Sequence, residues 1–258
     1  SADASNSWSG LSNVVSNKTL PAVTTAGGSI SVIQSAVDKV SASGGCVYLP
    51  PGDFTDSYST SNRVEIPGGV SVFGATTPVG AGTGVGLSAW STILRMSGSA
   101  DDNTWMFHLD GSNGKPSRIA NIAFVCYGAS SLGYDGVAID DVKDFRVDHC
   151  KFEAMGSVAI YVNSNYMDSN PGTWLLSQGV VDHNIFWNIY KTGTIAAGTG
   201  YAYGVAVQKG NHQNTQPWDP NIAHLMGNAT DTVFVEDNHF IGLRHCVMQD
   251  GAGRYVAR

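Results

Sequence analysis

Charged residues are scarce in this chain. Only 14% of its 258 residues are charged, whereas about 25% is usual in a soluble domain. Lys and Arg together number 14 and Asp and Glu 21, which gives a formal net charge of −7. This acidic balance argues against a broad phosphate-binding surface, so nucleic acid is not an expected partner. The chain also lacks an apolar run of about 18 residues, the length that a membrane helix needs, so no membrane span is expected.

Cysteines are few and widely spaced. The four are Cys46, Cys126, Cys150 and Cys246. They form no Cys-x-x-Cys pair, which excludes a zinc ribbon and a thioredoxin-type motif. Their even number permits none, one or two disulfides, and the spacing does not choose among these. Serine, threonine, asparagine and glycine are abundant while lysine is rare, a composition that favours an extracellular or cell-surface protein.

One segment near the N-terminus has the pattern of a helix. Four apolar residues recur with the i, i+3, i+4, i+7 spacing of an amphipathic helix: Ile33, Ala36, Val37 and Val40. The pair Gly44-Gly45 supplies a stop after them. We predict a helix over about residues 29–43. The rest of the chain alternates short strand-like runs with turn residues.

Two short motifs alternate along the remainder of the chain. The first places an apolar residue five positions before a phenylalanine, and it occurs over 119–124, 147–152, 181–186 and 235–240. A fifth copy starts at Val256. The second is a short apolar run, and it follows each of the first four copies, over 137–139, 158–160, 205–207 and 246–248. Strict alternation of two motifs indicates a structural repeat.

The spacing of the motifs separates a basic unit from insertions. The shortest step from the first motif to the second is 13 residues and the shortest return step is 8, so the minimal unit has 21 residues. Insertions at fixed corners of such a unit predict a β-solenoid, in which each coil stacks its strands on the previous coil. Val147 then points inward and Asp148 outward. Asn184 and Asn238, at the bends of successive coils, are expected to form a ladder.

The helix and the run that follows it, Gly44-Gly45-Cys46-Val47-Tyr48-Leu49-Pro50-Pro51-Gly52, resemble the N-terminal cap and first strand of the pectin-lyase-like superfamily. The later Val-x-x-Asn-x-Phe pattern resembles the coils of the same superfamily. The resemblance implies an all-β fold, a right-handed parallel β-helix, as a single domain over 1–258 with the N-terminal helix as its cap. The segment 147–152 is also similar to a short segment of the pectate lyases, which act on polysaccharides.

Three carboxylates take the same outward position in successive coils: Asp148, Asp182 and Glu236. Strands in register lie about 4.8 Å apart, so neighbouring charges would repel by about 3.5 kcal/mol at an effective dielectric of about 20. Solvation, a raised pKa or a cation would relieve this repulsion, and Ca²⁺ suits oxygen ligands best. In the pectate lyases that the sequence resembles, calcium and the anionic sugar occupy this face. The alternatives are a wet polar face whose acids cap turns, and direct acid or base catalysis.

His149 and His183 follow two of these acids and share one position in successive coils, with Asp237 in the next coil. An imidazole there is a candidate general base, and His183 is our alternative to the bases that the pectate-lyase resemblance implies. The simpler alternative is a turn residue with a locally satisfied ring nitrogen. The pectate-lyase resemblance implies two other candidate bases, Lys191 and Arg244.

Long insertions in the solenoid carry aromatic side chains. Loops of this length are often functional, and aromatic rings at their tips suit a sugar polymer. We predict that five residues bind an extended polysaccharide: Trp174, Tyr190, Tyr203, Trp218 and His245. The alternative is that the tryptophans fold back onto the flank of the solenoid. Asp140 and Asp141 are predicted to be surface or turn residues.

These features support two functional hypotheses. The first is a secreted carbohydrate-active β-helix that binds or cleaves an acidic polysaccharide by lyase-type β-elimination, with glycoside hydrolysis as the second enzymatic choice. The other is a non-catalytic structural or adhesive β-helix, such as a component of a surface layer, fibre or spike. The chain stops at Arg258, within the fifth repeat, so we expect a further segment or another chain to cover that end of the solenoid.

Overall fold

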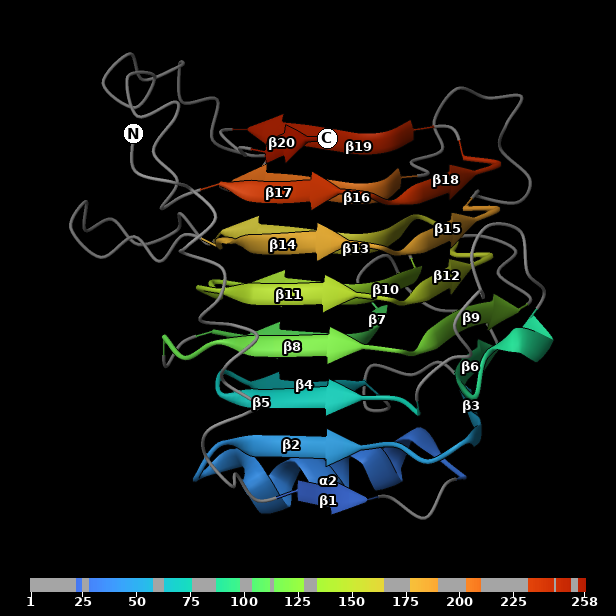
Figure 1. The fold of residues 1–258 in the computed structure, drawn as a ribbon, viewed down its shortest axis with the longest axis vertical. Helices are drawn as coiled ribbons and strands as arrows, with labels where there is room; N and C mark the ends of the chain where they lie inside the picture. Colours follow the sequence, from blue (N-terminus) through green and yellow to red (C-terminus); the bar gives the residue numbers. More distant parts are fainter. Residues whose placement is uncertain are drawn as a thin grey trace.

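The computed structural model shows a stack of coils built from three parallel β-sheets, with one helix at the N-terminal end of the stack (Figure 1). The structure describes residues 22–24, 28–57, 63–75, 87–97, 104–111, 114–127, 134–164, 177–189, 203–209, 232–243, 245–251 and 255–258. All neighbouring strands within each sheet run parallel. The predicted all-β parallel β-helix with an N-terminal capping helix is therefore confirmed.

Each complete coil contributes one strand to each sheet. Sheet A contains β1 (Ala22–Thr24), β2 (Gly45–Tyr48), β5 (Val70–Phe73), β8 (Ser117–Ala120), β11 (Phe145–Asp148), β14 (Gly179–Asp182), β17 (Val233–Glu236) and β20 (Tyr255–Ala257). Sheet B contains β3 (Gly52–Ser57), β6 (Thr92–Ser97), β9 (Ala123–Tyr127), β12 (Lys151–Glu153), β15 (Ile185–Trp187) and β18 (His239–Ile241). Sheet C contains β4 (Val64–Pro67), β7 (Thr104–Asp110), β10 (Tyr134–Asp140), β13 (Val158–Ser164), β16 (Tyr203–Lys209) and β19 (His245–Gly251). A short 3₁₀ helix, η2 (Leu87–Ala89), precedes β6.

The register of sheet A confirms the first four copies of the first sequence motif. The fifth copy was aligned wrongly by one residue, because Ala257 and not Val256 pairs with Val235. Ile119, Val147, Val181 and Val235 pair with one another along successive strands. All four are buried. Because side chains alternate across a strand, the residue after each valine emerges on the outer face. Side chains from distant parts of the chain therefore form columns along the axis of the stack.

The second motif was aligned wrongly at two of its copies. The structure pairs Val137 with Ile160, and Val205 with Val247, whereas the sequence alignment matched Val137 with Val158 and Val205 with Cys246. Shifting the pairing of two strands by two residues keeps the same side chains facing inward, so the sequence pattern also permits Val158 as the partner of Val137. A shift of one reverses the face, and Cys246 is accordingly exposed. Short apolar runs do not specify their own register.

The phenylalanines of the first motif form a stacked column in the core. The rings of Phe124 and Phe152 lie 5.0 Å apart with an angle of 3° between their planes. Phe152 stacks on Phe186 at 5.2 Å, and Phe186 on Phe240 at 4.7 Å. The first three rings are fully buried, and burying one such side chain contributes about 1.5–3 kcal/mol. This column and the valine column of sheet A hold successive coils in register.

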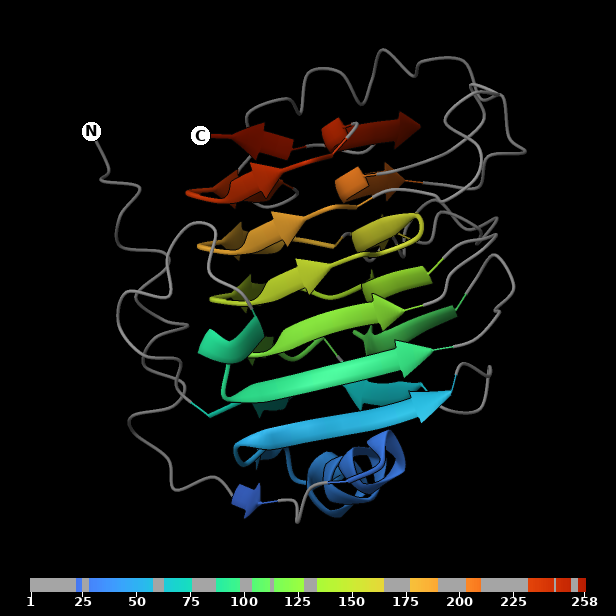
Figure 2. The same ribbon diagram turned by 90° about the vertical axis from the view of Figure 1, so that its right-hand side faces the viewer.

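Helix α2 (Ile30–Ser41) packs at the N-terminal end of the stack (Figure 2). The hydroxyl of Ser29 accepts a hydrogen bond from the backbone N–H of Ser31 and so caps the helix. The apolar stripe predicted from the sequence is buried. Gly44 follows the helix with φ 74°, a conformation that costs glycine little. The helix thereby shields the first coil from water.

All four cysteines are free, which resolves the disulfide alternatives. Cys46, Cys126 and Cys150 are buried and Cys246 is exposed. Burial raises the pKa of the Cys46 thiol, which keeps it protonated. None of the helices in the described ranges is long and apolar enough to cross a membrane.

The predicted asparagine ladder is present at the bends between sheets A and B. The side-chain oxygen of Asn184 accepts from the backbone N–H of Cys150 at 2.9 Å, and its amide group donates to the carbonyl of Val147 at 2.9 Å. Asn238 repeats the pattern one coil later, because its oxygen accepts from the backbone N–H of Asn184 and its amide group donates to the carbonyl of Val181. Asn184 is completely buried.

Substituting Asn184 with alanine is expected to lower the free energy of unfolding by about 2–3 kcal/mol, because a buried N–H and a buried carbonyl would both lose their partner. Chemical denaturation would measure the loss. Asn238→Ala is the matched control. Asn238 is only partly buried, so water can replace its bonds and the loss should be smaller. Equal losses in the two variants would contradict this account.

Candidate functional site

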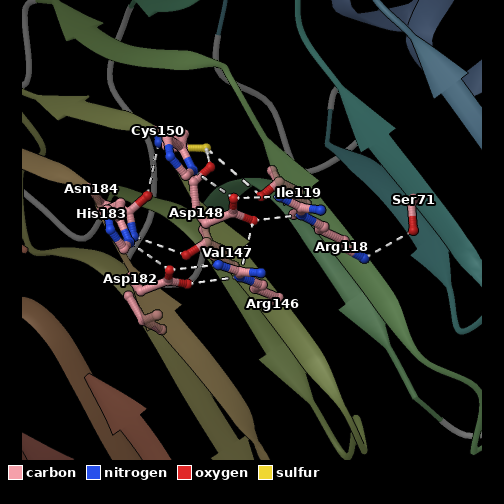
Figure 3. Close-up of polar contacts among 12 residues, drawn as sticks. Ser71, Arg118, Ile119, Arg146, Val147, Asp148, Cys150, Asp182, His183 and Asn184 are labelled. Carbon is pink, nitrogen blue, oxygen red and sulfur yellow. Dashed lines mark hydrogen bonds and ion pairs between the residues drawn. The ribbon is translucent and has the colours of Figure 1, made fainter. Parts of the chain in front are cut away.

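The outer face of sheet A carries a staggered ladder of arginine and aspartate (Figure 3). Arg146 and Asp148 lie two residues apart on β11, so both side chains leave the same face of the sheet. The guanidinium of Arg118 on β8 donates to both carboxylate oxygens of Asp148, at 2.7 and 2.6 Å. Arg146 in turn donates to both oxygens of Asp182 on β14, at 2.9 and 2.7 Å. Each arginine thus neutralises the aspartate of the next coil.

The carboxylates of this ladder are shielded from water. Asp148 is 0% exposed and Asp182 is 4% exposed. Burial alone would raise the pKa of Asp148, but hydrogen bonds from His149 and Arg118 and nearby positive charges outweigh burial and hold that pKa below its ordinary value. The hydrogen bond to Asp182 raises the pKa of Arg146. The repulsion expected between neighbouring acids is therefore relieved by guanidinium groups.

Two histidines stand at the bends that follow β11 and β14. His149 and His183 have φ values of 53° and 56°, in the left-handed region. Nδ1 of each ring lies 2.7 Å from Oδ2 of the aspartate that precedes it. The two rings stack with their centroids 5.1 Å apart and an angle of 6° between their planes. About half of each side chain, 51%, is exposed. The histidine column expected from the repeat is therefore present.

The aspartates determine which ring nitrogen is available for chemistry. An ionised carboxylate only accepts hydrogen bonds, so Nδ1 of each neutral ring carries the proton and Nε2 keeps the lone pair. The hydrogen bond with Asp148, and the charges of Asp148 and Asp182, raise the pKa of His149. A buried aspartate that is paired with an arginine and holds a half-exposed imidazole is the arrangement of an oriented acid or base.

The ladder changes in the next coil. Glu236 on β17 continues the register of Asp148 and Asp182, and its Oε1 lies 3.2 Å from Nε of Arg258. Asp237 takes the position of the histidines, with φ 52°. Among the described residues, the aspartate–histidine pair therefore occurs in two successive coils and ends at β17.

The residues predicted to bind calcium have other partners. All four carboxylate oxygens of Asp148 and Asp182 accept from arginine or histidine, and Glu236 is paired with Arg258. Ca²⁺ requires roughly six to eight oxygen ligands. Within the described ranges, no three His, Cys, Asp or Glu residues form a group that could hold a metal ion. The donor set therefore does not fit calcium.

The structure describes two of the other predicted site residues. Tyr203 begins β16 and His245 begins β19, and their ring centroids lie 5.2 Å apart. Both lie at the start of sheet C strands, whereas His183 lies between sheet A and sheet B. They therefore occupy a different corner of the coil from His183. Five predicted residues lie outside the described ranges: Lys191, Arg244, Trp174, Tyr190 and Trp218.

Arg118 and Arg146 are the site residues that the sequence predictions missed. The tripeptide Arg146-Val147-Asp148 places an arginine and a carboxylate on the same face of a strand. Arg118 takes the equivalent position one coil earlier. The alignment of repeats that brought the acids together also brings each arginine beside the acid of the next coil. That register is the signal by which the ion pairs could have been found.

A second polar cluster joins three strands of sheet C. His108 on β7 lies between two carboxylates, with Nδ1 2.5 Å from Oε2 of Glu65 on β4 and Nε2 2.7 Å from Oδ2 of Asp140 on β10. Burial lowers the pKa of His108, but the hydrogen bonds and charges of Asp140 and Glu65 raise it to about 9. Asp141 lies in a turn with φ 55°, as predicted, whereas Asp140 ends β10 and binds His108. Both ring nitrogens are engaged, so this cluster joins coils.

Raising the pH is expected to destabilise the protein through His108. A histidine whose pKa is about 9 in the folded state and about 6.5 in the unfolded state contributes stability that is fully present below about pH 6.5. This stability is lost as the pH rises through about 9. The difference in pKa corresponds to about 3 kcal/mol. Urea unfolding at about pH 6 and about pH 10 would measure the decrease in the free energy of unfolding.

Two variants separate the contribution of His108 from that of other groups that titrate. His108→Gln should remove most of the loss of stability between these two pH values. His239→Gln replaces an exposed histidine on β18 and should leave the loss unchanged. If His108→Gln retains the full pH dependence, the assignment of the effect to His108 is wrong.

Comparison with known protein families finds no matching family model, and comparison with curated proteins finds no matching sequence. Among solved structures, the ORF18 protein of Geobacillus virus E2 is 13% identical with a TM-score of 0.41, over 90% of this chain and 48% of that chain. Two mannuronan C-5 epimerase modules from Azotobacter vinelandii are also similar. The AlgE4 A-module is 11% identical with a TM-score of 0.23, over 88% of this chain and 95% of that chain. The AlgE6 A-module is 13% identical with a TM-score of 0.28, over 81% of this chain and 60% of that chain. This chain thus spans about half of the viral protein, and its fold follows from its own strand registers.

Proposed function

We propose that this chain is a secreted or cell-surface, carbohydrate-active β-helix protein that binds an acidic polysaccharide on the outer face of sheet A and cleaves it by β-elimination. The observation that carries the proposal is the pair of stacked imidazoles on successive coils, each oriented by an aspartate that is buried beneath it. One solvent-facing imidazole is common on a protein surface. Two oriented imidazoles side by side supply an acid and a base at neighbouring atoms of a substrate.

The two rings take different roles in this proposal. Two positive charges 5.1 Å apart repel each other, so the pair takes up one proton more readily than two. We assign the role of the acid to His149, because its hydrogen bond with Asp148 raises its pKa. The role of the base then goes to His183. Beneath them the charges of Arg118, Arg146, Asp148 and Asp182 cancel.

The reaction requires no other co-reactant. Nε2 of His183 takes the proton from C5 of a uronate sugar, the C–H electron pair forms the C4–C5 double bond, and the C4–O bond breaks. The imidazolium of His149 donates its Nε2 proton to the departing glycosidic oxygen. Solvent then returns a proton to His149 and removes one from His183. The products are an unsaturated uronate end and a chain with a free hydroxyl.

The positive charge of the site favours an anionic sugar. His149 is positively charged in this scheme, and the guanidinium groups of Arg118 and Arg146 are about a quarter exposed. The carboxylates that pair with them are buried. A polymer that lies along the outer face of sheet A therefore meets cationic groups first. This electrostatic complementarity supports a uronate polymer over a neutral glycan.

The test is incubation with polygalacturonate, alginate and a neutral glycan, each with added calcium and each with a chelator. We expect the absorbance of unsaturated uronate ends to rise with one uronate polymer, to remain flat with the neutral glycan, and to persist with the chelator because no step uses calcium. New reducing ends without this absorbance would indicate hydrolysis and would overturn the elimination. No cleavage of any polymer would favour a structural or adhesive role.

A further inference from the structure

The outer face of sheet A continues from the histidine pair toward the N-terminal end of the stack. The register places Tyr48 on β2 beside Phe73 on β5, Phe73 beside Ala120 on β8, and Ala120 beside Asp148 on β11. These residues form one column along the axis, on the face that carries the Arg–Asp ladder. The column is aromatic at its N-terminal end and acidic beside the histidines.

Tyr48 presents its ring at the surface. Tyr48 is 38% exposed. Among the exposed large hydrophobic residues in the described part of the chain, Tyr48 is the one aromatic residue. The ring stacks on Phe73, with centroids 5.5 Å apart and an angle of 25° between planes. Phe73 is 8% exposed and therefore holds the tyrosine ring from below. The orientation of Tyr48 is thus fixed by packing before a ligand arrives.

A cationic group joins this aromatic pair to the histidine site. The guanidinium carbon of Arg118 lies 5.8 Å from the centroid of the Phe73 ring, and the same guanidinium binds Asp148. Asp148 in turn orients His149. A series of contacts therefore joins the exposed aromatic ring, through Phe73, Arg118 and Asp148, to the stacked imidazoles.

We propose that Tyr48 is an aromatic subsite that stacks against a sugar ring of the same polysaccharide chain whose scissile bond lies at His149 and His183. This inference rests on the proposed function. One face of a pyranose ring consists largely of C–H bonds, which pack on an aromatic face, while its hydroxyls and carboxylate remain free to contact water and Arg118. Sheet A provides the alignment, because a polymer parallel to its axis passes over both positions.

The length of the substrate follows from the register. Tyr48 lies on β2 and His183 follows β14, and β5, β8 and β11 lie between them. Strands in a sheet lie about 4.8 Å apart, so Tyr48 and His183 are about 19 Å from each other along the axis. An oligosaccharide of two or three sugars cannot span this distance. The subsite therefore discriminates between long and short chains of the same polymer.

The test uses the intact chain and the uronate polymer that the wild-type protein binds most tightly among polygalacturonate and alginate. Tyr48→Ala should weaken binding of the polymer about tenfold in titration calorimetry, raise KM by a similar factor, and leave kcat unchanged. Cleavage of a trisaccharide of the same uronate should be unaltered, because a trisaccharide positioned at His149 and His183 does not reach Tyr48. Tyr48→Phe should bind as the wild type does, because it keeps the aromatic face.

Val256→Ala is the matched control, because Val256 is similarly exposed on the same face of sheet A but is aliphatic. It should leave binding of the polymer unchanged. Polymer binding by Tyr48→Ala that equals the wild type, or an equal loss in cleavage of the trisaccharide, would overturn the subsite while the proposed function stands. A wild-type protein that binds neither uronate polymer would overturn both. A melting temperature of Tyr48→Ala equal to that of the wild type would exclude misfolding as the cause of a loss of polymer binding.

Discussion

Replacing His183 with asparagine is expected to lower kcat on the uronate polymer by a factor of about 10²–10⁴, the usual contribution of a positioned general base. Asparagine tolerates the left-handed backbone that His183 adopts, and its amide group can donate to Asp182 as the imidazole does. The variant should therefore fold normally while losing the group that takes the C5 proton. KM should change little, because the missing group acts mainly in the transition state.

His149→Asn should also lower kcat, because the imidazolium that protonates the leaving oxygen is lost. The pH profile of the wild type should then be bell-shaped, with activity falling at low pH as the base is protonated and at high pH as the acid loses its proton. Since the pKa of His149 is raised, the alkaline limb should lie above the pKa of free imidazole.

His239→Asn is the matched control for both variants, because His239 is exposed on β18 of sheet B and belongs to neither aspartate–histidine pair. It should retain wild-type kcat. A kcat for His183→Asn that equals the wild-type value, with normal folding, would rule out His183 as the base. Loss of stability in His183→Asn comparable to the loss of activity would point to a structural role.

Replacing Arg118 with methionine is expected to lower the free energy of unfolding by about 3–5 kcal/mol, the usual cost of removing one partner of a buried ion pair. Asp148 is completely buried, and Arg118 supplies two of its hydrogen bonds. The nearest remaining guanidinium, that of Arg146, lies 3.6 Å away and is already bound to Asp182. Urea denaturation at neutral pH would measure the loss.

The double variant Arg118→Met and Asp148→Asn should recover a large part of this loss, because it removes the buried charge as well as its arginine partner. Arg95→Met is the matched control. Arg95 pairs with Asp53 on the outer face of sheet B, and about half of the Asp53 side chain is exposed, so the cost there should be at most about 1 kcal/mol. If Arg118→Met and Arg95→Met are equally stable, the burial of Asp148 does not govern the energetics of the ladder.

The coil could be predicted because its main determinants are local and repeated. Val147, Val181 and Val235 each begin the same six-residue pattern, and only a stack of coils buries all of them together. Asn184 and Asn238 were predictable for the same reason, since both occupy the bend where asparagine satisfies the backbone. The sheet C strands were harder to align, because Val158 and Cys246 lie in short apolar runs that permit more than one register.

The composition and repeats of the chain determined the class of fold, the helix at the N-terminal end, and the columns of acids and histidines along sheet A. Only the tertiary structure decided which charged side chains pair with one another. It paired Asp148 and Asp182 with arginines of the preceding coil, and it placed His108 between carboxylates from two other coils. The physical reason is that periodicity specifies which face a side chain leaves from, whereas its charge partner depends on the direction in which a long side chain crosses to the next coil.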